Sequence, residues 1–350
     1  MDRDQSRFLA HPRIPKRAHL GVALAATAII ATACSGPGAS PGGGGGGGGW
    51  QPAGPITIVV PFAAGGPTDT VTRQIAGPMG EALGQQIIVS NVAGAGGTVA
   101  AGQVAAAAPD GLTVLMHHIG MSTAPSLYPD LDYDPLTSFK TIGLVTEVPM
   151  TIIGAARFEP NTLEELVEYV KTNGTNVNYA NAGVGAASHL CGVMIENAIG
   201  ADVTEVEYEG TGPAIDDLLN PASQDVDFLC DQTTNTTTHI NAGTVKAYAI
   251  TSPQRNDALP DVPTTAEAGL PDVEVQVWHG LYVPADTPDN VVQALTAALK
   301  ESLTNETVIA EFAKLGTAPV GADQATPAAH TAKLQEQIEL WQPLLEGAGG

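Results

Sequence analysis

The chain has 350 residues, in which 14 basic residues stand against 37 acidic ones, a net charge of −23. The length allows about two domains at ~150 residues each, and a hydrophobic content of 43% excludes wholesale disorder. A chain this acidic lacks the basic face that binds a phosphate backbone, so we expect no nucleic-acid partner.

The first 33 residues have the features of an export signal. Five basic residues lie within residues 1–19, and an apolar run of 11 residues follows over 20–30, too short for the ~20 residues that span a bilayer. Small residues directly precede Cys34, which resembles the cleavage site of a lipoprotein. We therefore expect a lipoprotein signal peptide over 1–33 and a lipid on Cys34, with an ordinary signal peptide as the alternative.

Residues 34–54 follow as a glycine-rich segment, which is typical of a flexible tether. The anchor and tether would hold a globular body at a membrane surface, and we expect that body to fold in water. Residues 1–33 contain five of the basic and two of the acidic residues, so the exported chain carries nine basic and 35 acidic residues, a net charge of −26.

From residue 55 on, short β-rich runs alternate with helical patterns, which predicts an α/β fold with parallel strands. The expected strands are 56–62, 85–91, 112–118, 176–180, 203–208, 225–231, 245–252 and 278–284, and the clearest helices are 68–83, 162–173, 210–220, 288–303, 307–315 and 326–346. The pattern forms two units, each with glycine-rich loops at the carboxyl ends of its strands. Ligands of open α/β sheets bind at those ends.

The loop over 63–69 is the first candidate site. Its two glycines let the backbone approach a ligand, and the helix that follows leaves unpaired N–H groups with a partial positive charge. The loops over 181–189 and 209–214 have the same character, and all three predict an anion site without a cationic side chain. The alternative is that each loop is a tight strand–helix turn. A fourth loop, 92–97, resembles only a broken dinucleotide fingerprint, so we expect no cofactor.

Cysteines and histidines suggest other chemistry less strongly. Cys191 and Cys230 are predicted to form a disulfide in an oxidising compartment, with two free thiols as the alternative. His189 and Cys191 are two residues apart, so their side chains would diverge by about 200° on a helix, and a nucleophile set with Asp231 is not expected. The His117-His118 pair has no further ligand at metal-binding spacing, so we expect no metal site.

Several motifs together resemble the Bug family, the extracytoplasmic solute receptors of tripartite tricarboxylate transporters. They lie at 59–70 (VVPFAAGGPTDT), 91–111, 133–139, 178–190, 208–219, 259–269 and 278–288, and the likeness covers about 55–346 in the family's order. The stretches 188–192, 229–240 and 278–282 are most similar to the aspartate-binding Bug receptors.

The resemblance implies a type II periplasmic-binding-protein (Venus flytrap) fold of two Rossmann-like domains joined by crossover hinge strands. Domain 1 would comprise 55–152 plus 274–350, and domain 2 would comprise 153–273. The expected function is capture of a small carboxylate, either aspartate or a C4-type di- or tricarboxylate, for delivery to membrane transporter subunits. The protein would be a monomer on the outer face of the cytoplasmic membrane or in the periplasm, and not an enzyme.

The resemblance also implies the ligand-binding residues. In the first domain these are Phe62, Ala64, Gly65, Gly66, Thr68 and Asp69, and in the second they are Asn181, Gly183, Gly185, Ser188 and His189, with Gly210 to Ala214 nearby. Backbone N–H groups, hydroxyls and water would hold one carboxylate of the ligand.

Asp231 ends a predicted strand and is a further candidate. A carboxylate there would repel a dicarboxylate but could pair with an ammonium, so Asp231 is hypothesised to select an amino dicarboxylate. The alternative is that it caps the next helix through the N–H groups of Thr234 or Asn235.

Two other functions remain as alternatives at this point. The protein could be a sensor that passes ligand occupancy to a signalling system. It could also be a secreted α/β enzyme, although the chain lacks a G-x-S-x-G nucleophile elbow.

Overall fold

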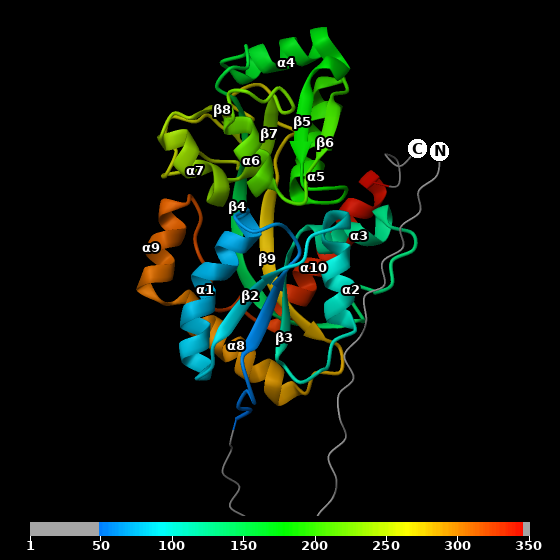
Figure 1. The fold of residues 1–350 in the computed structure, drawn as a ribbon, viewed down its shortest axis with the longest axis vertical. Helices are drawn as coiled ribbons and strands as arrows, with labels where there is room; N and C mark the ends of the chain where they lie inside the picture. The colour runs from blue at the N-terminus through cyan, green and yellow to red at the C-terminus, as the bar shows by residue number, and fades with distance from the viewer. Residues whose placement is uncertain (1–48, 346–350) are drawn as a thin grey trace, which may run out of the picture. The chain divides into compact units, whose positions relative to one another are not determined.

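The computed structural model describes residues 49–345, so the signal peptide, Cys34 and most of the glycine-rich tether lie outside the described residues. Strands in the order β2-β1-β3-β9-β4-β7-β5-β6 follow one another across a mixed sheet, with β8 pairing β4 off this path. Two groups of elements form around it (Figure 1).

The first group surrounds the strands β1 (Ile56–Val60), β2 (Ile87–Asn91) and β3 (Thr113–His118), which are parallel. β9 (Gln276–Pro284) is antiparallel to β3 on one side and to β4 (Phe139–Ala155) on the other. The helices of this group are α1 (Pro67–Leu83), α2 (Thr98–Ala105), α3 (Gly120–Leu127), α8 (Asp289–Leu303), α9 (Glu306–Lys314) and α10 (Pro327–Leu345), with a short 3₁₀ turn, η1 (Ala95–Gly97), before α2.

The second group is built around β5 (Asn178–Asn181), which is parallel to β6 (Thr204–Glu207) and to β7 (Phe228–Gln232). The end of β4 is antiparallel to β7 and to β8 (Val245–Ile250). The helices here are α4 (Leu163–Asn173), α5 (Ala187–Ile199), α6 (Thr211–Leu219) and α7 (Thr233–Asn241), with a 3₁₀ turn, η2 (Gly174–Asn176), after α4.

The 17-residue strand β4 belongs to both groups. Its residues 139–149 pair β9, and its residues 150–155 pair β7 and β8. We call the first group of elements, which includes β9 and residues 139–149 of β4, the first lobe. We call the second group, which includes the elements from α4 to β8 and residues 150–155 of β4, the second lobe. In Figure 1, β4 and β9 run between the two groups, as crossover strands of a two-lobed fold should.

The strand directions correct one expectation. The alternating pattern predicts parallel strands, but β4, β8 and β9 are antiparallel to their neighbours. The parallel pairs are confined to the strand–helix–strand units of each lobe, where a helix returns the chain to the same edge.

Helix α1 shows how the sequence positions the first-lobe loop. Proline at its first position suits a helix start, and Gly84 ends it in a left-handed conformation. Its apolar face packs on β1 and α8 in a core of buried residues that includes Ile56, Ile58, Val71, Ile75, Met79, Leu83, Leu295 and Leu299. Each such side chain contributes about 1.5–3 kcal/mol when buried, so the start of α1 is held firmly at the carboxyl end of β1.

None of the helices within residues 49–345 combines the length and the apolar composition that crossing a bilayer requires.

Candidate ligand-binding site

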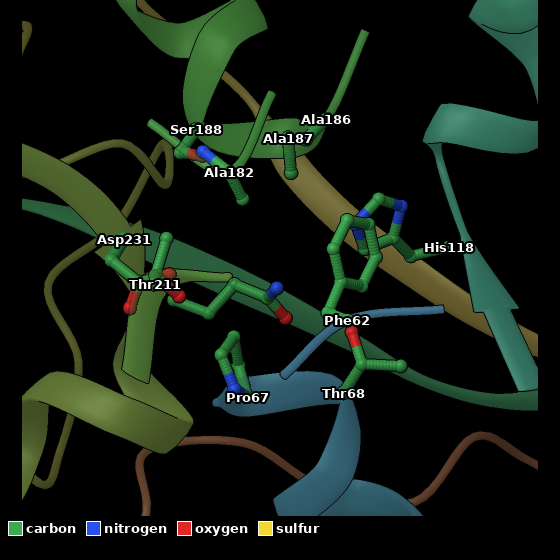
Figure 2. A pocket seen from close by; sticks show the side chains of 11 residues that line it. Phe62, Pro67, Thr68, His118, Ala182, Ala186, Ala187, Ser188, Thr211 and Asp231 are labelled. Carbon is green, nitrogen blue, oxygen red and sulfur yellow. The ribbon is translucent and has the colours of Figure 1, made fainter. Parts of the chain in front are cut away.

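A cavity lies at the seam between the two lobes, where side chains from both surround one space (Figure 2). The space free of atoms is about 270 Å³, counted to its open mouth. The first lobe contributes Phe62, Pro67, Thr68 and His118, and the second contributes Ala182, Ala186, Ala187, Ser188, Thr211, Asp231 and Gln232.

Four helices begin at this cavity. Pro67 and Thr68 open α1, Ala187 and Ser188 open α5, and Thr211 opens α6. Gln232 is the N-cap residue of α7. In none of the four does the N-cap side chain bond to the helix's first N–H groups. Each helix start therefore directs unpaired N–H groups and a partial positive charge toward the same region, which is favourable for an anion.

The lining holds no lysine or arginine among the residues that the structure describes. Three buried histidines beside it are also uncharged at neutral pH, because burial lowers the pKa of His117 to about 4, that of His279 to about 3 and that of His118 well below its usual value. The positive potential of the site thus comes from the backbone.

Hydroxyl groups also line the cavity. Thr68 Oγ1 lies 3.3 Å from His279 Nε2, and Ser188 Oγ accepts a hydrogen bond from the Ala182 N–H at 2.9 Å. Because the Ser188 oxygen is already an acceptor, its O–H remains available to donate to a ligand. Phe62 stacks on the ring of His118, with centroids 4.7 Å apart, and forms the apolar wall.

Asp231 is the acidic member of the lining and is 1% exposed. Its carboxylate accepts hydrogen bonds from Asn235 Nδ2 at 2.7 Å, from the Gln232 backbone N–H and from the Thr211 hydroxyl. Burial nevertheless raises the pKa of Asp231 to about 6, since desolvation outweighs these three bonds. The N-cap of α7 is Gln232 rather than Asp231, so the structure gives Asp231 a bond to the Asn235 side chain in place of the predicted cap.

Asp69, also predicted from the sequence, stabilises the loop between β1 and α1 next to the cavity. Its carboxylate accepts hydrogen bonds from the Gly65 N–H at 3.0 Å, from Arg73 at 2.8 and 2.9 Å and from Asn91 Nδ2 at 3.0 Å. Burial would raise the pKa of Asp69, but these bonds outweigh it and lower the pKa. The network fixes the loop between β1 and α1, and Asp69 does not line the cavity.

The predicted glycines bring the lobes together. The Ala63 N–H donates to the Glu209 carbonyl at 2.8 Å across the seam. A Cβ added to Gly210 would lie 3.0 Å from Ala63 N, and one added to Gly66 would lie 3.5 Å from Gly212 N. Ala64 and Gly65 complete the same turn, and Ala214 is a buried residue of α6. These residues set how closely the lobes approach.

The remaining predicted residues shape the loop between β5 and α5. The Asn181 side chain accepts a bond from the Gly183 N–H at 2.8 Å, and His189 Nδ1 accepts one from the Gly185 N–H at 3.3 Å. Gly183 and Gly185 have φ angles of +96° and +80°, which favour glycine. Of the fourteen predicted residues, Phe62, Thr68, Ser188 and Asp231 line the cavity itself.

His118 and Gln232 line the cavity although the sequence did not single them out as ligand contacts. Both lie at the carboxyl end of a strand, β3 and β7 respectively. The strand-end position is the signal that could have found them. Pro67, Ala182, Ala186, Ala187 and Thr211 belong to loops that the sequence did indicate.

A disulfide joins Cys191 of α5 to Cys230 of β7. Cys191 therefore has no thiol, which removes the basis for a nucleophile set with His189 and Asp231. Among residues 49–345 no group of three or more histidine, cysteine, aspartate or glutamate side chains is arranged to hold a metal ion.

Comparison with known proteins identifies the family. The family described as "Tripartite tricarboxylate transporter family receptor" matches residues 71–349. The chain belongs to this receptor family. Like the other members, it is a periplasmic-type solute receptor, and the family's proteins are receptors rather than enzymes.

Individual relatives agree along the body of the chain. A UPF0065 protein from the TAR-I ttuE-ttuC' intergenic region of Agrobacterium vitis is 49% identical over 298 residues, 85% of each chain. The structure of the periplasmic binding protein BugD is 48% identical with a TM-score of 0.82, covering 85% of this chain and 98% of that one. MatC from Rhodopseudomonas palustris, solved with bound malate, is 40% identical with a TM-score of 0.81, covering 84% of this chain and 100% of MatC. The two-lobed α/β fold expected from the sequence is thereby confirmed.

Proposed function

We propose that this receptor captures a small carboxylate between its lobes and delivers it to a tripartite tricarboxylate transporter. The observation that carries the proposal is the convergence of four helix starts, none with a side-chain cap, on one cavity that lacks a cationic side chain. Such a site suits an anion that is held by backbone N–H groups. The bound malate of MatC supports a carboxylate of this size.

Capture requires the cleft to open and close. Residues 55–152 with 274–350, and residues 153–273, are proposed to move as two bodies about the crossover strands, with the ligand favouring the closed form through contacts to both. A lipid on Cys34 and the segment to residue 54 would keep the monomeric receptor close to the membrane-embedded transporter subunits.

A thermal-shift screen tests the carboxylate class directly. Ligand at 100 times its Kd stabilises the folded protein by about 2.7 kcal/mol, and each kcal/mol raises Tm by about 2–4 °C for a domain of roughly this size. Aspartate, malate, succinate and citrate form the first panel. No shift with any carboxylate would contradict the proposal.

A charge variant tests the helix-start mechanism. Ala187→Asp places a carboxylate at the start of α5, in the cavity lining, where it should repel the ligand and abolish the shift. Ala198→Asp adds the same charge near the other end of α5, at an exposed position, and should leave the shift intact. Equal losses in both variants would argue against an anion site at the helix start.

Within this class, an amino dicarboxylate such as aspartate is proposed as the ligand. Asp231 lies in an otherwise anion-favouring cavity, and its negative charge would repel a dicarboxylate unless the ligand also carries an ammonium that pairs with it. Calorimetry on Asp231→Asn should show a loss of aspartate affinity of about tenfold or more, since charged hydrogen bonds contribute about 1.5–3 kcal/mol, with little loss for succinate. Parallel changes for both ligands would refute the role of Asp231.

A further inference from the structure

Gln232 lines the cavity, and its side-chain carbonyl oxygen has no hydrogen-bond partner in the part of the chain that the structure describes. The residue ends β7, is the N-cap of α7 and is 2% exposed. Its Oε1 atom is buried and accepts no hydrogen bond from the described residues. A buried acceptor without a partner is unfavourable, so its position at a ligand cavity points to a donor on the ligand.

The other polar side chains of the lining differ in this respect. The hydroxyls of Thr68 and Ser188 lie within bonding distance of His279 and Ala182, and Thr211 donates to Asp231. Asp231 itself accepts three hydrogen bonds from the protein. Among the described residues of the lining, Gln232 Oε1 is therefore the side-chain acceptor that has no partner in the protein.

An amide oxygen can only accept, so it cannot hold a ligand carboxylate, which also only accepts. It can hold a hydroxyl or an ammonium group on the ligand's carbon skeleton. The four helix starts supply donors for the carboxylates, and the Gln232 amide nitrogen is a further donor. The amide oxygen is the part of this side chain that can distinguish ligands by a donor on their carbon skeleton.

Resting on the carboxylate function proposed above, we infer that Gln232 is a specificity-determining residue for ligands that carry a hydrogen-bond donor beside their carboxylates. Gln232 favours hydroxy and amino dicarboxylates over unsubstituted ones. Asp231 then separates the two favoured classes, since its charge prefers an ammonium to a hydroxyl. Gln232 thus recognises whether the substituent donates a hydrogen bond, and Asp231 recognises whether it carries a positive charge.

The test compares three probes that share a C4 dicarboxylate skeleton: succinate, malate and aspartate. Calorimetry is run on the wild type, on Gln232→Met, which keeps a similar volume without a strong acceptor, and on Gln232→Glu, which keeps an acceptor. In Gln232→Met the Kd values for malate and aspartate should each rise about tenfold relative to that for succinate. In Gln232→Glu all three ligands should weaken, but the preference for the substituted ligands should remain.

A matched control is Gln337→Met in α10. Gln337 is also a buried glutamine, but its Oε1 accepts a bond from Trp341 Nε1 at 3.2 Å and it lies outside the cavity. Its loss should lower Tm without changing the ratio of the three affinities.

The outcomes separate the two proposals. If Gln232→Met weakens succinate, malate and aspartate by the same factor, the Gln232 inference is wrong while the carboxylate function stands. If the wild type binds none of the three but binds another carboxylate of the thermal-shift panel, the Gln232 inference is wrong while the carboxylate function stands. If it binds no carboxylate of the panel, both fail. If Gln232→Met does not fold, loss of the preference for substituted ligands in Gln232→Glu overturns the inference.

Discussion

Asp231 shows how one buried side chain ties ligand choice to pH. Its pKa of about 6 reflects burial, so the carboxylate is ionised at pH 7.5 and mostly protonated at pH 5. Only the ionised form can pair with an ammonium. Aspartate affinity should therefore fall about tenfold between pH 7.5 and pH 5, because one protonation with a pKa near 6 opposes binding by a factor of ten per unit below it.

Calorimetry across this range checks the prediction. The Asp231→Asn variant is the control, because its amide does not titrate, and its weaker aspartate affinity should stay nearly constant. A wild-type profile as flat as that of the variant would remove Asp231 from ligand recognition.

The same carboxylate should cost the empty receptor stability. The pKa of Asp231 is raised from 3.8 to about 6 on folding, so the folded state binds the proton more tightly than the unfolded state. This tighter proton binding stabilises the folded state fully below about pH 4, and the stabilisation is lost as the pH rises through 6. A shift of this size corresponds to roughly 3 kcal/mol at neutral pH.

Asp231→Asn should accordingly raise the Tm of the ligand-free protein at pH 7.5, by an amount that shrinks toward pH 5. Thermal unfolding at both pH values measures the difference. A lower Tm at pH 7.5 would show that the three hydrogen bonds to the carboxylate outweigh its desolvation.

At the scale of the elements, loop glycines govern how the lobes meet. Gly96 has a φ of +61°, and a Cβ there would overlap the carbonyl oxygen of Val184 in the second lobe. The same oxygen accepts a hydrogen bond from the Tyr128 hydroxyl at 2.8 Å. A methyl group at residue 96 should force the lobes apart.

Gly96→Ala should therefore weaken ligand binding about tenfold or more. Gly243→Ala is the matched control, because Gly243 has a φ of +66° and nothing within 4 Å of an added Cβ, so it shares the backbone cost of about 1 kcal/mol without the contact. Calorimetry measures the affinities, and small-angle scattering with saturating ligand should show a more open Gly96→Ala protein. Equal effects in the two variants would assign the loss to backbone strain alone.

The limits of the sequence are clearest for these elements. Local patterns predicted α1, α4, α8 and the strand–loop–helix units well, because each depends on caps, glycines and spacing of apolar residues nearby in the chain. They did not predict β4, in which Gly143 and Pro149 interrupt the apolar run, or the antiparallel path of β9. Asp69 does not line the cavity, and its carboxylate is bonded to Asn91, which is distant in the sequence. Gln232 lines the cavity together with residues of the other lobe. No local sequence pattern encodes either arrangement.

At the scale of the whole molecule, net charge opposes the function that the site supports. The chain carries a net charge of −23, and the cavity relies on helix starts whose field acts only at short range. A second groove beside the cavity is lined from both lobes by residues that include Tyr128, Glu207 and Glu209. Its acidic rim adds to the repulsion that an approaching anion meets.

Added salt should therefore increase the association rate of an anionic ligand, because it screens the repulsion over a Debye length of ~10 Å at 0.1 M. Stopped-flow fluorescence between 25 and 250 mM salt should show a rise in the association rate that is larger for succinate, a dianion, than for aspartate.

The Glu207→Gln/Glu209→Gln variant should bind faster at low salt and respond less to added salt. Glu164→Gln/Glu168→Gln removes the same charge from α4, outside both the cavity and this groove, and should behave like the wild type. An association rate that falls steeply with salt would contradict this account. It would mean that the charges around the cavity attract the anion at long range although the net charge of the chain is negative.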